Sequence, residues 1–215
     1  MSNPIVIAYH LIWTAYGYWL PNDPRGSMSN AIACDVIREL GELHYGRKRV
    51  QPSGREVRAF LNEVANVLKY PLMTFDAAAV AAIGEEFSHV VERERYTCYA
   101  CAIMPDHVHM VIRKHKDSAE EMISRLQDAS RMKLSMSELR TFDHPVWGGP
   151  GWSVFLDHPE DVRRTIRYVE QNPEKIGRPV QHWPFVKPYD NWPLHPGHSP
   201  NSPYVKALKS AGRYP

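Results

Sequence analysis

The sequence predicts an α+β fold: a ferredoxin-like antiparallel sheet with helices on one face, plus one more helix near the C-terminal end. Three observations predict it. Segments typical of strands and helices follow one another in the order strand, helix, strand, strand, helix, strand, helix. Only Pro105 and Asp106 separate the two middle strands, which is typical of a hairpin. Hydrophobic residues make up 43% and charged residues 23% of the chain, as in globular domains.

The first half of the chain begins with a strand and continues with loops and helices. Residues 4–13, PIVIAYHLIW, are β-branched and aromatic, which predicts a buried strand. Residues 18–30 are rich in Pro, Asn, Asp and Gly and predict turns. A short helix is expected at CDVIREL, residues 34–40. Longer helices are expected at about 55–68 and 76–95, and in the second of these the apolar residues recur every three or four positions.

The second half contains the hairpin, two more helices and a fourth strand. These elements are expected at residues 96–104 and 107–114 (the hairpin), 118–136 and 159–172 (the helices), and 146–156 (the strand). Ser118 and Glu121 have the spacing of a capping box, which predicts a helix start at Ser118. Pro159 suits the first turn of the last helix, and Pro173 ends it.

We expect one domain at residues 1–178, with an insertion at about 20–75, followed by a Pro- and aromatic-rich tail at 179–215. Three cysteines do not make a disulfide framework and suit a reducing compartment. No segment has the pattern of a signal peptide, and no apolar run approaches the ~18 residues that a membrane span needs. The sequence therefore predicts a cytoplasmic protein without a membrane partner. Its net charge of +2 discriminates little between partners.

Two histidines lie two residues apart in the otherwise apolar stretch MPDHVHMVI, residues 104–112. In a strand, side chains at positions i and i+2 point to the same face, so His107 and His109 project together. Two adjacent imidazoles are a natural chelating pair for one cation. The alternative is that they form local hydrogen bonds on the hairpin. Two histidines alone do not decide between these interpretations.

A third group for such a site should come from another element, and the last predicted helix offers two. Tyr168 and Asn172 are four residues apart, hence on one face of the helix. A tyrosine hydroxyl beside a metal is a potential nucleophile, and an asparagine oxygen is a plausible metal ligand. The alternative is that Tyr168 packs in the core and Asn172 simply ends the helix.

Taken together, these motifs resemble those of the single-tyrosine HUH transposases of the insertion-sequence type, in particular the REP-associated tyrosine transposases. The resemblance rests on the His-hydrophobic-His pattern after the Met-Pro-Asp turn, on YVEQNP at residues 168–173, and on HWPF at 182–185. It spans about residues 5–190. The segment from Ser27 to Arg95 is longer than in compact members of the family, and the end of the tail has no counterpart in them.

The resemblance implies a reaction and the residues that perform it. His107 and His109 match the two metal-binding histidines, and Tyr168 matches the nucleophile. Asn172 matches the third, amide ligand, for which Gln171 is the weaker choice. The implied reaction is the metal-dependent cleavage and strand transfer of single-stranded or hairpin DNA through a 5′-phosphotyrosine, as in DNA transposition. The last helix would then be a catalytic helix, with Mg²⁺ or Mn²⁺ as the metal. A monomer and a homodimer are both compatible with the sequence.

Basic and aromatic side chains are candidates for DNA contacts. The basic candidates on the last helix and at the end of the histidine strand are Arg163, Arg164, Arg167, Arg113 and Lys114. A further basic cluster is RKR at residues 47–49, and the alternative for each cluster is a solvated face. Trp183, Phe185 and Trp192 either stack on unpaired bases or pin the tail to the core.

Three other interpretations compete with a transposase. A histidine-triad hydrolase would need a third alternating histidine, but position 111 is Val. A zinc site at Cys98 and Cys101 is disfavoured, because residues i and i+3 of a regular strand face opposite sides and no second pair follows. We expect both cysteines to be buried as small hydrophobic residues. A domesticated protein that binds DNA hairpins without cleaving them stays open as the alternative function.

Overall fold

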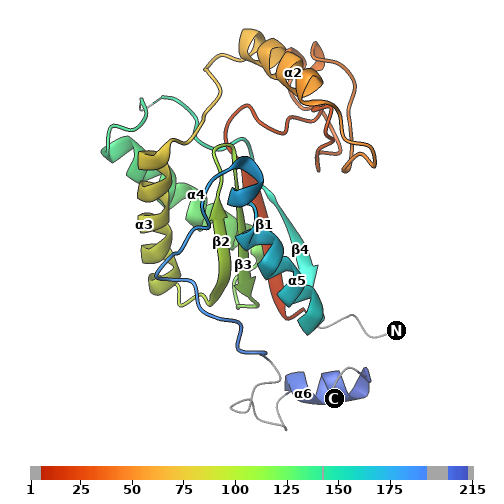
Figure 1. The fold of residues 1–215 in the computed structure, drawn as a ribbon, viewed down its shortest axis with the longest axis vertical. Helices are drawn as coiled ribbons and strands as arrows, with labels where there is room; N and C mark the ends of the chain where they lie inside the picture. Colours follow the sequence, from red (N-terminus) through yellow and green to blue (C-terminus); the bar gives the residue numbers. More distant parts are fainter. Residues whose placement is uncertain (1–5, 142, 193–202, 213–215) are drawn as a thin grey trace.

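A computed structural model of the protein describes residues 6–141, 143–192 and 203–212 (Figure 1). Its centre is a four-stranded antiparallel sheet in the order β2-β3-β1-β4. The strands are β1 (Ala8–Thr14), β2 (Cys98–Ile103), β3 (His107–Arg113) and β4 (Trp152–Leu156). With β1 and β3 in the middle, this is the ferredoxin-like arrangement, so the predicted fold class is confirmed.

Helices cover both faces of this sheet. α3 (Ala77–Arg93) and α4 (Ala119–Met136) pack on one face over a large apolar cluster. α5 (Pro159–Glu170) lies on the other face, where its Val162 and Val169 are buried (Figure 1). The predicted separation of the last helix from the others is confirmed. None of the described helices is long and apolar enough to cross a membrane.

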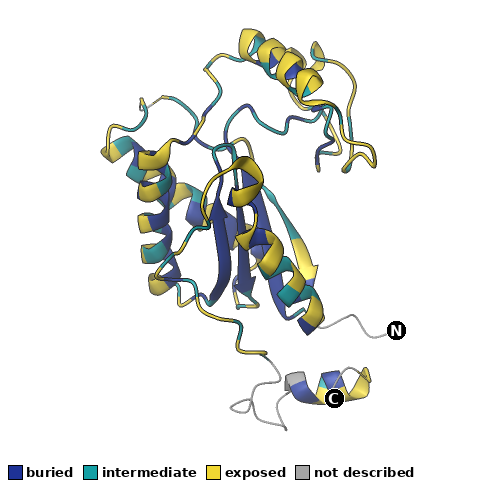
Figure 2. Cartoon of the chain, viewed as in Figure 1, coloured by how far each residue is buried: buried dark blue, intermediate teal, exposed yellow. Residues whose placement is uncertain are grey.

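The central strand β1 is buried along its whole length (Figure 2). Because strand side chains alternate, its odd-numbered residues face α3 and α4, and its even-numbered residues face α5. The even-numbered set is Ala8, His10, Ile12 and Thr14. Two of these four side chains are polar although they are buried. Buried polar groups need partners or a function, so the α5 side of the sheet is where a site is to be sought.

The capping box predicted at the start of α4 is present. The Ser118 hydroxyl accepts a hydrogen bond from the Glu121 backbone at 3.2 Å, and the Glu121 carboxylate accepts one from the Ser118 backbone at 2.7 Å. Ser118→Ala is therefore expected to lower the free energy of unfolding by about 1 kcal/mol. Urea denaturation measures this change. Ser124→Ala, at an exposed position within the same helix, is the control, and equal stability of the two variants would contradict the prediction.

The two cysteines of β2 are buried, as expected. They do not, however, lie on opposite faces of the strand. A β-bulge between Cys98 and Ala100 shifts the register of β2 against β3. Cys98 and Cys101 therefore both point into the cluster under α3 and α4, and the prediction that they face opposite sides is wrong. Burial raises the pKa of both thiols, which keeps them protonated. They are packing residues rather than metal ligands.

Residues 19–72 form an insertion beyond one end of the sheet (Figure 1). It contains the two helices expected there, α1 (Asp35–Arg38) and α2 (Gly54–Val67). Its own apolar cluster is built on the buried side chains of Leu20, Phe60 and Val64. The insertion is thus held together separately from the two large clusters of the sheet.

The tail after α5 first runs beside β2. The Gln181 side chain makes hydrogen bonds of 2.8 Å to both the backbone N–H and the carbonyl of Ile103. Phe185 is buried in the core, and the Trp183 ring packs so closely on Gly84 that a Cβ there would lie 2.1 Å from it. Trp183 and Phe185 therefore pin the tail. A helix not expected from the sequence, α6 (Pro203–Ser210), follows.

Parts of two predictions lie outside the described residues. They are the start of the first strand at residues 4–5 and the tail segments 193–202 and 213–215.

Candidate active site

Three histidines lie together on the face of the sheet that α5 covers. In the ladder between β1 and β3, His109 lies opposite Ile12, two residues from His10. The side chains of His107 and His109 therefore project on the same side as His10. The ring centroids of His107 and His109 are 4.8 Å apart. The structure brings the two predicted histidines together and adds a third.

His107 is oriented by the residue that precedes it. Its Nδ1 atom lies 2.6 Å from Oδ1 of Asp106. Burial would raise the pKa of the Asp106 carboxyl, but the hydrogen bond and charge of His107, with a contribution from Arg25, hold this pKa below its usual value. A carboxylate only accepts, so His107 donates its Nδ1–H. This pairing fixes the ring and leaves Nε2 as the nitrogen available to a metal.

His109 is oriented by His10. Nε2 of His10 lies 3.0 Å from Nδ1 of His109, and both side chains are buried. Burial lowers the pKa of His10 to about 4. The pKa of His109 is also lowered, first by burial and then by repulsion from the neighbouring groups that can carry positive charge, namely His107, His10 and Lys175. Both rings are therefore neutral at neutral pH. When His109 donates its Nδ1–H to His10, its Nε2 keeps a lone pair for a metal.

The burial of His10 predicts a pH dependence of stability in EDTA. The imidazole titrates near pH 6.5 in the unfolded chain but near pH 4 in the folded protein. Between these values the unfolded state binds more protons, so stability is highest above pH 6.5 and falls as the pH drops. The expected loss by pH 4 is up to ~3 kcal/mol. Urea unfolding between pH 7 and pH 4.5 should show a shallower slope for His10→Gln than for the exposed control His89→Gln, and equal slopes would contradict the assignment.

Tyr168 lies beside these histidines in the same chain. Its ring centroid is 5.5 Å from that of His109 and 6.1 Å from that of His10. The side chain remains accessible, because the residue is 39% exposed. The ammonium of Lys175 lies 4.0 Å from the ring centroid, where it contacts the π-face. Only two residues separate β4 from α5, so the helix is held closely to the sheet that carries the histidines.

Asn172 is buried just past the end of α5, whereas Gln171 is exposed. The Oδ1 atom of Asn172 accepts a hydrogen bond of 3.0 Å from the Lys175 ammonium. Its Nδ2 atom is buried and has no hydrogen-bond partner among the described residues. Of the two amides considered, Asn172 is therefore the one that points inward, and Lys175 links it to Tyr168.

His10 and Lys175 were not predicted as site residues. For His10 a signal exists, because it is a polar residue that interrupts the apolar run PIVIAYHLIW. For Lys175 the sequence holds no comparable signal. Its position depends on the 3₁₀ helix η1 (Pro173–Ile176), which turns the chain back toward Tyr168.

Two imidazole nitrogens of this site are oriented as in metal-binding histidines. Both predicted histidines have Nδ1 engaged and Nε2 available, which is the usual arrangement of metal-binding imidazoles. The Asn172 oxygen accepts from Lys175 but retains a second lone pair. In the described part of the chain no group of three or more His, Cys, Asp and Glu side chains is placed to hold a metal. A metal at the histidine pair would therefore need oxygen ligands such as the amide of Asn172, water or the substrate.

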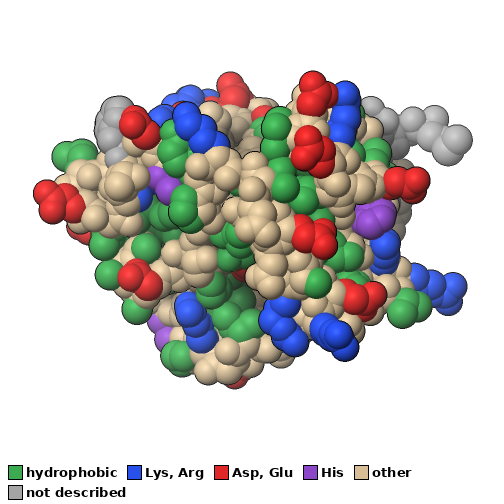
Figure 3. All heavy atoms as spheres, turned by 90° about the horizontal axis from the view of Figure 1, so that it is seen from above, with side chains coloured by type: hydrophobic (Ala, Val, Ile, Leu, Met, Phe, Trp, Pro, Cys, Tyr) green, Lys and Arg blue, Asp and Glu red, His purple; other side chains and the backbone are tan. Residues whose placement is uncertain are grey.

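A cavity of about 550 Å³ opens beside Tyr168. The sheet contributes the imidazoles and Trp152, and α5 contributes Arg164, Thr165 and Tyr168. The insertion supplies the remaining wall, which consists of Trp19, Gly26, Ser27, Met28, Arg47 and Gln51. Seen from the end of the molecule that carries the insertion, Lys and Arg side chains lie among exposed hydrophobic ones (Figure 3). The histidines and the tyrosine are thus reached through a pocket with cationic and aromatic walls.

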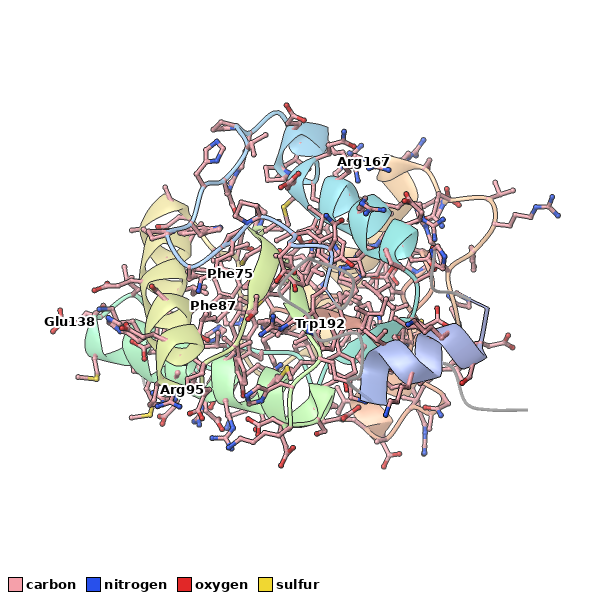
Figure 4. All side chains as sticks on the ribbon, turned by 90° about the horizontal axis from the view of Figure 1, so that it is seen from below. Phe75, Phe87, Arg95, Glu138, Arg167 and Trp192 are labelled. Carbon is pink, nitrogen blue, oxygen red and sulfur yellow. The ribbon has the colours of Figure 1, made fainter. Side chains whose placement is uncertain are left out.

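Of the arginines predicted on the last helix, the structure places one at this cavity. Arg164 lines it and forms an ion pair of 2.7 Å with Asp161. Arg163 turns instead toward Glu160 and the tail. Arg167 lies on the outer side of α5 (Figure 4). Arg164 is therefore the predicted arginine best placed to meet a phosphate near Tyr168.

The other basic cluster lies at the far end of the histidine strand. Arg113 ends β3, six residues after His107, and its guanidinium is 3.6 Å from the Asp190 carboxylate. The same guanidinium lies 5.4 Å from the Trp192 ring centroid. The backbone N–H of Lys114 donates to Ile7. The structure does not bring Arg113 and Lys114 to the cavity.

Comparison with known proteins finds solved structures only. No protein-family model and no curated protein matches the chain. One similar structure is a "putative transposase" from Deinococcus radiodurans R1, 11% identical, with a TM-score of 0.39 over 80% of this chain and 94% of that chain. Another is a REP-associated tyrosine transposase bound to a REP hairpin, 13% identical, with a TM-score of 0.39 over 100% of this chain and 87% of that chain. Both are described as transposases. They are the kind of protein that the motifs resemble, but similarity at this level leaves the function to be inferred from the site.

Proposed function

We propose that this protein is a metal-dependent enzyme that cuts and rejoins single-stranded DNA, a single-tyrosine transposase or a related hairpin-processing nuclease. One observation carries the proposal: Tyr168 lies against His109 in the same chain, beside a histidine pair whose Nδ1 atoms are both engaged. A nucleophile next to two preoriented imidazoles is what a metal-assisted attack on a phosphodiester needs. The single-stranded or hairpin DNA substrate is inferred from the motif resemblance.

In the proposed reaction the Tyr168 hydroxyl attacks the scissile phosphorus. A P–O bond to the tyrosine forms, the bond to the 3′ oxygen breaks, the phenol loses its proton, and the departing 3′ oxygen gains one. A divalent metal held by His107, His109 and Asn172 would withdraw charge from the phosphate. The Lys175 ammonium contacts the tyrosine ring and can also meet the negative charge of the bound phosphate. Attack by a second 3′-hydroxyl reverses the step, so no ATP is required.

The geometry also bears on how many copies the reaction needs. Tyr168, the three histidines and Asn172 all belong to one chain. Arg164 of α5 and Arg47 of the insertion place two cations at the cavity beside them, where they can hold the phosphates on either side of the cleaved bond. We therefore propose that a monomer carries a complete cleavage site and that a homodimer, if it forms, serves to hold two DNA ends.

A gel assay tests this function directly. The protein is incubated with labelled single-stranded hairpin DNA from beside its own gene and with Mg²⁺ or Mn²⁺, then run on a denaturing protein gel. A covalent protein–DNA band that EDTA prevents is the expected result. Binding of the hairpin without any band would favour the DNA-binding protein that does not cleave. Absence of both on several hairpins would contradict DNA as the substrate.

A further inference from the structure

The wall that the insertion adds to the cavity is preorganised around one tryptophan. Trp19 adopts a left-handed backbone conformation, with φ of +54°, which a bulky residue rarely takes. The Arg25 guanidinium lies 3.8 Å from the centre of its ring. Arg25 is in turn held by two hydrogen bonds to the fully buried carboxylate of Asp23. Backbone strain of this kind persists where the surrounding structure enforces it, often at ligand sites.

The same wall is tied to a second stretch of the insertion by backbone hydrogen bonds. The N–H of Ser27 donates to the His44 carbonyl at 2.8 Å, and the N–H of Gly46 donates to the Ser27 carbonyl at 2.6 Å. Gly26 packs on Gly46 so tightly that a Cβ would lie 1.8 Å from its carbonyl oxygen. These contacts fix the backbone beside Arg47. The backbone that carries this cation is therefore fixed relative to the cavity, and the exposed Arg47 side chain extends from it.

The cavity combines the features that single-stranded nucleic acid requires. Trp19 and Trp152 give it aromatic surface from opposite elements, the insertion and β4. Arg47 and Arg164 give it positive charge. The indole Nε1 of Trp19 is shielded from solvent and has no hydrogen-bond partner among the described residues. A volume of about 550 Å³ lies within the roughly 300–1,000 Å³ of small-ligand pockets. A base that is paired and stacked in a duplex has to leave the stack before it can enter such a pocket.

We propose that this cavity binds a single unpaired nucleotide of the substrate strand, the one adjacent to the phosphate that Tyr168 attacks. Its base contacts Trp19 and Trp152, and its phosphate faces Arg47 and Arg164. The inference rests on the proposed cleavage function and adds a subsite to it. The centroid distance of 6.2 Å between Trp19 and His107 places this nucleotide next to the histidine pair.

The test uses abasic sites. The cleaved phosphate is first mapped from the covalent product of the wild-type protein. A set of hairpin oligonucleotides then carries one abasic site each, at successive positions on both sides of that phosphate. Binding to Tyr168→Phe protein is measured by fluorescence anisotropy. We expect one position at which loss of the base weakens binding by about tenfold or more, as removal of a base–aromatic contact does.

Two tryptophan variants identify the pocket. In Tyr168→Phe/Trp19→Ala and Tyr168→Phe/Trp152→Ala proteins, the same abasic site should no longer weaken binding, because the partner of the base is gone. Tyr45→Ala, exposed in the same insertion, and Phe155→Ala, exposed on the other face of β4, are matched controls in which the effect should persist. Circular dichroism checks folding, and if Trp19→Ala unfolds, the β4 variant decides.

The outcomes separate this inference from the function on which it rests. A covalent adduct together with equal binding of every abasic oligonucleotide overturns the nucleotide subsite and leaves the cleavage function standing. An abasic effect that survives in both tryptophan variants also overturns it, since the base is then bound elsewhere. Absence of the adduct and of hairpin binding contradicts the function and the subsite together.

Discussion

Replacing Tyr168 by Phe is expected to lower the rate of covalent adduct formation by about 10³-fold or more, because the phenol oxygen is the atom that bonds to phosphorus. DNA affinity should stay close to that of the wild-type protein. The ring, its contacts with His10 and His109, and the Lys175 ammonium over its face do not require the hydroxyl. The measurements are the time course of the adduct on a denaturing gel and the dissociation constant of the hairpin.

Tyr189→Phe is the matched control for this substitution. Tyr189 lies in the tail, packs near α5 and uses its hydroxyl for a hydrogen bond of 2.8 Å to the Trp192 carbonyl. Loss of this hydroxyl should lower the free energy of unfolding slightly and leave the rate of adduct formation unchanged. An adduct that forms at the wild-type rate with Tyr168→Phe would show that another side chain is the nucleophile. The cluster around Tyr168 would then be a packing feature.

If the proposed metal site is correct, replacement of His107 or His109 by Ala is expected to weaken Mn²⁺ binding by at least about 100-fold, because each would remove one of two imidazole ligands. His107→Ala should also leave the half-buried Asp106 carboxylate without its donor. Adduct formation should fall by a similar factor at limiting metal, and excess metal should rescue it only in part. Isothermal titration of the metal-free protein with Mn²⁺ measures the affinity without depending on DNA.

His89→Ala provides the control for nonspecific loss of an imidazole. His89 is exposed on α3 and pairs with Glu86 at 3.3 Å, on the opposite side of the sheet from the site. Its replacement should leave the Mn²⁺ affinity as it is in the wild-type protein. If both site variants bind Mn²⁺ as tightly as the wild type does, the metal is held elsewhere. If none of the proteins binds Mn²⁺, the proposed metal site is wrong. The histidine trio would then be a buried polar network.

The central part of the site could be predicted because it depends on local periodicity. The two-residue repeat of a strand places His107 and His109 on one face, and the four-residue spacing of a helix does the same for Tyr168 and Asn172. Local spacing does not predict that β3 and α5 lie against each other. This contact depends on the fold as a whole. His10 was missed because strand pairing, not spacing, puts it 3.0 Å from His109.

The rest of the site depends on contacts that leave no trace in the sequence. Trp19 and Arg47 line the same cavity as Tyr168, although more than 100 residues separate them from it in the chain. The bulge at Cys98 likewise could not be predicted, because no glycine or proline lies in or beside it. Neither periodicity nor turn chemistry encodes such features, because they arise when separately folded segments pack together.

The short connection between β4 and α5 limits where α5 can lie relative to the sheet. Asp157 and His158 are its only residues, and two residues span about 7 Å even when fully extended. The start of α5 therefore stays close to the end of β4, and Tyr168 can meet the histidines of another copy only if α5 leaves its own sheet. Under the proposed function, each molecule is expected to cut with its own tyrosine. In a mixture of active and inactive copies, activity should follow the number of intact molecules, and an inactive copy should not suppress an active one.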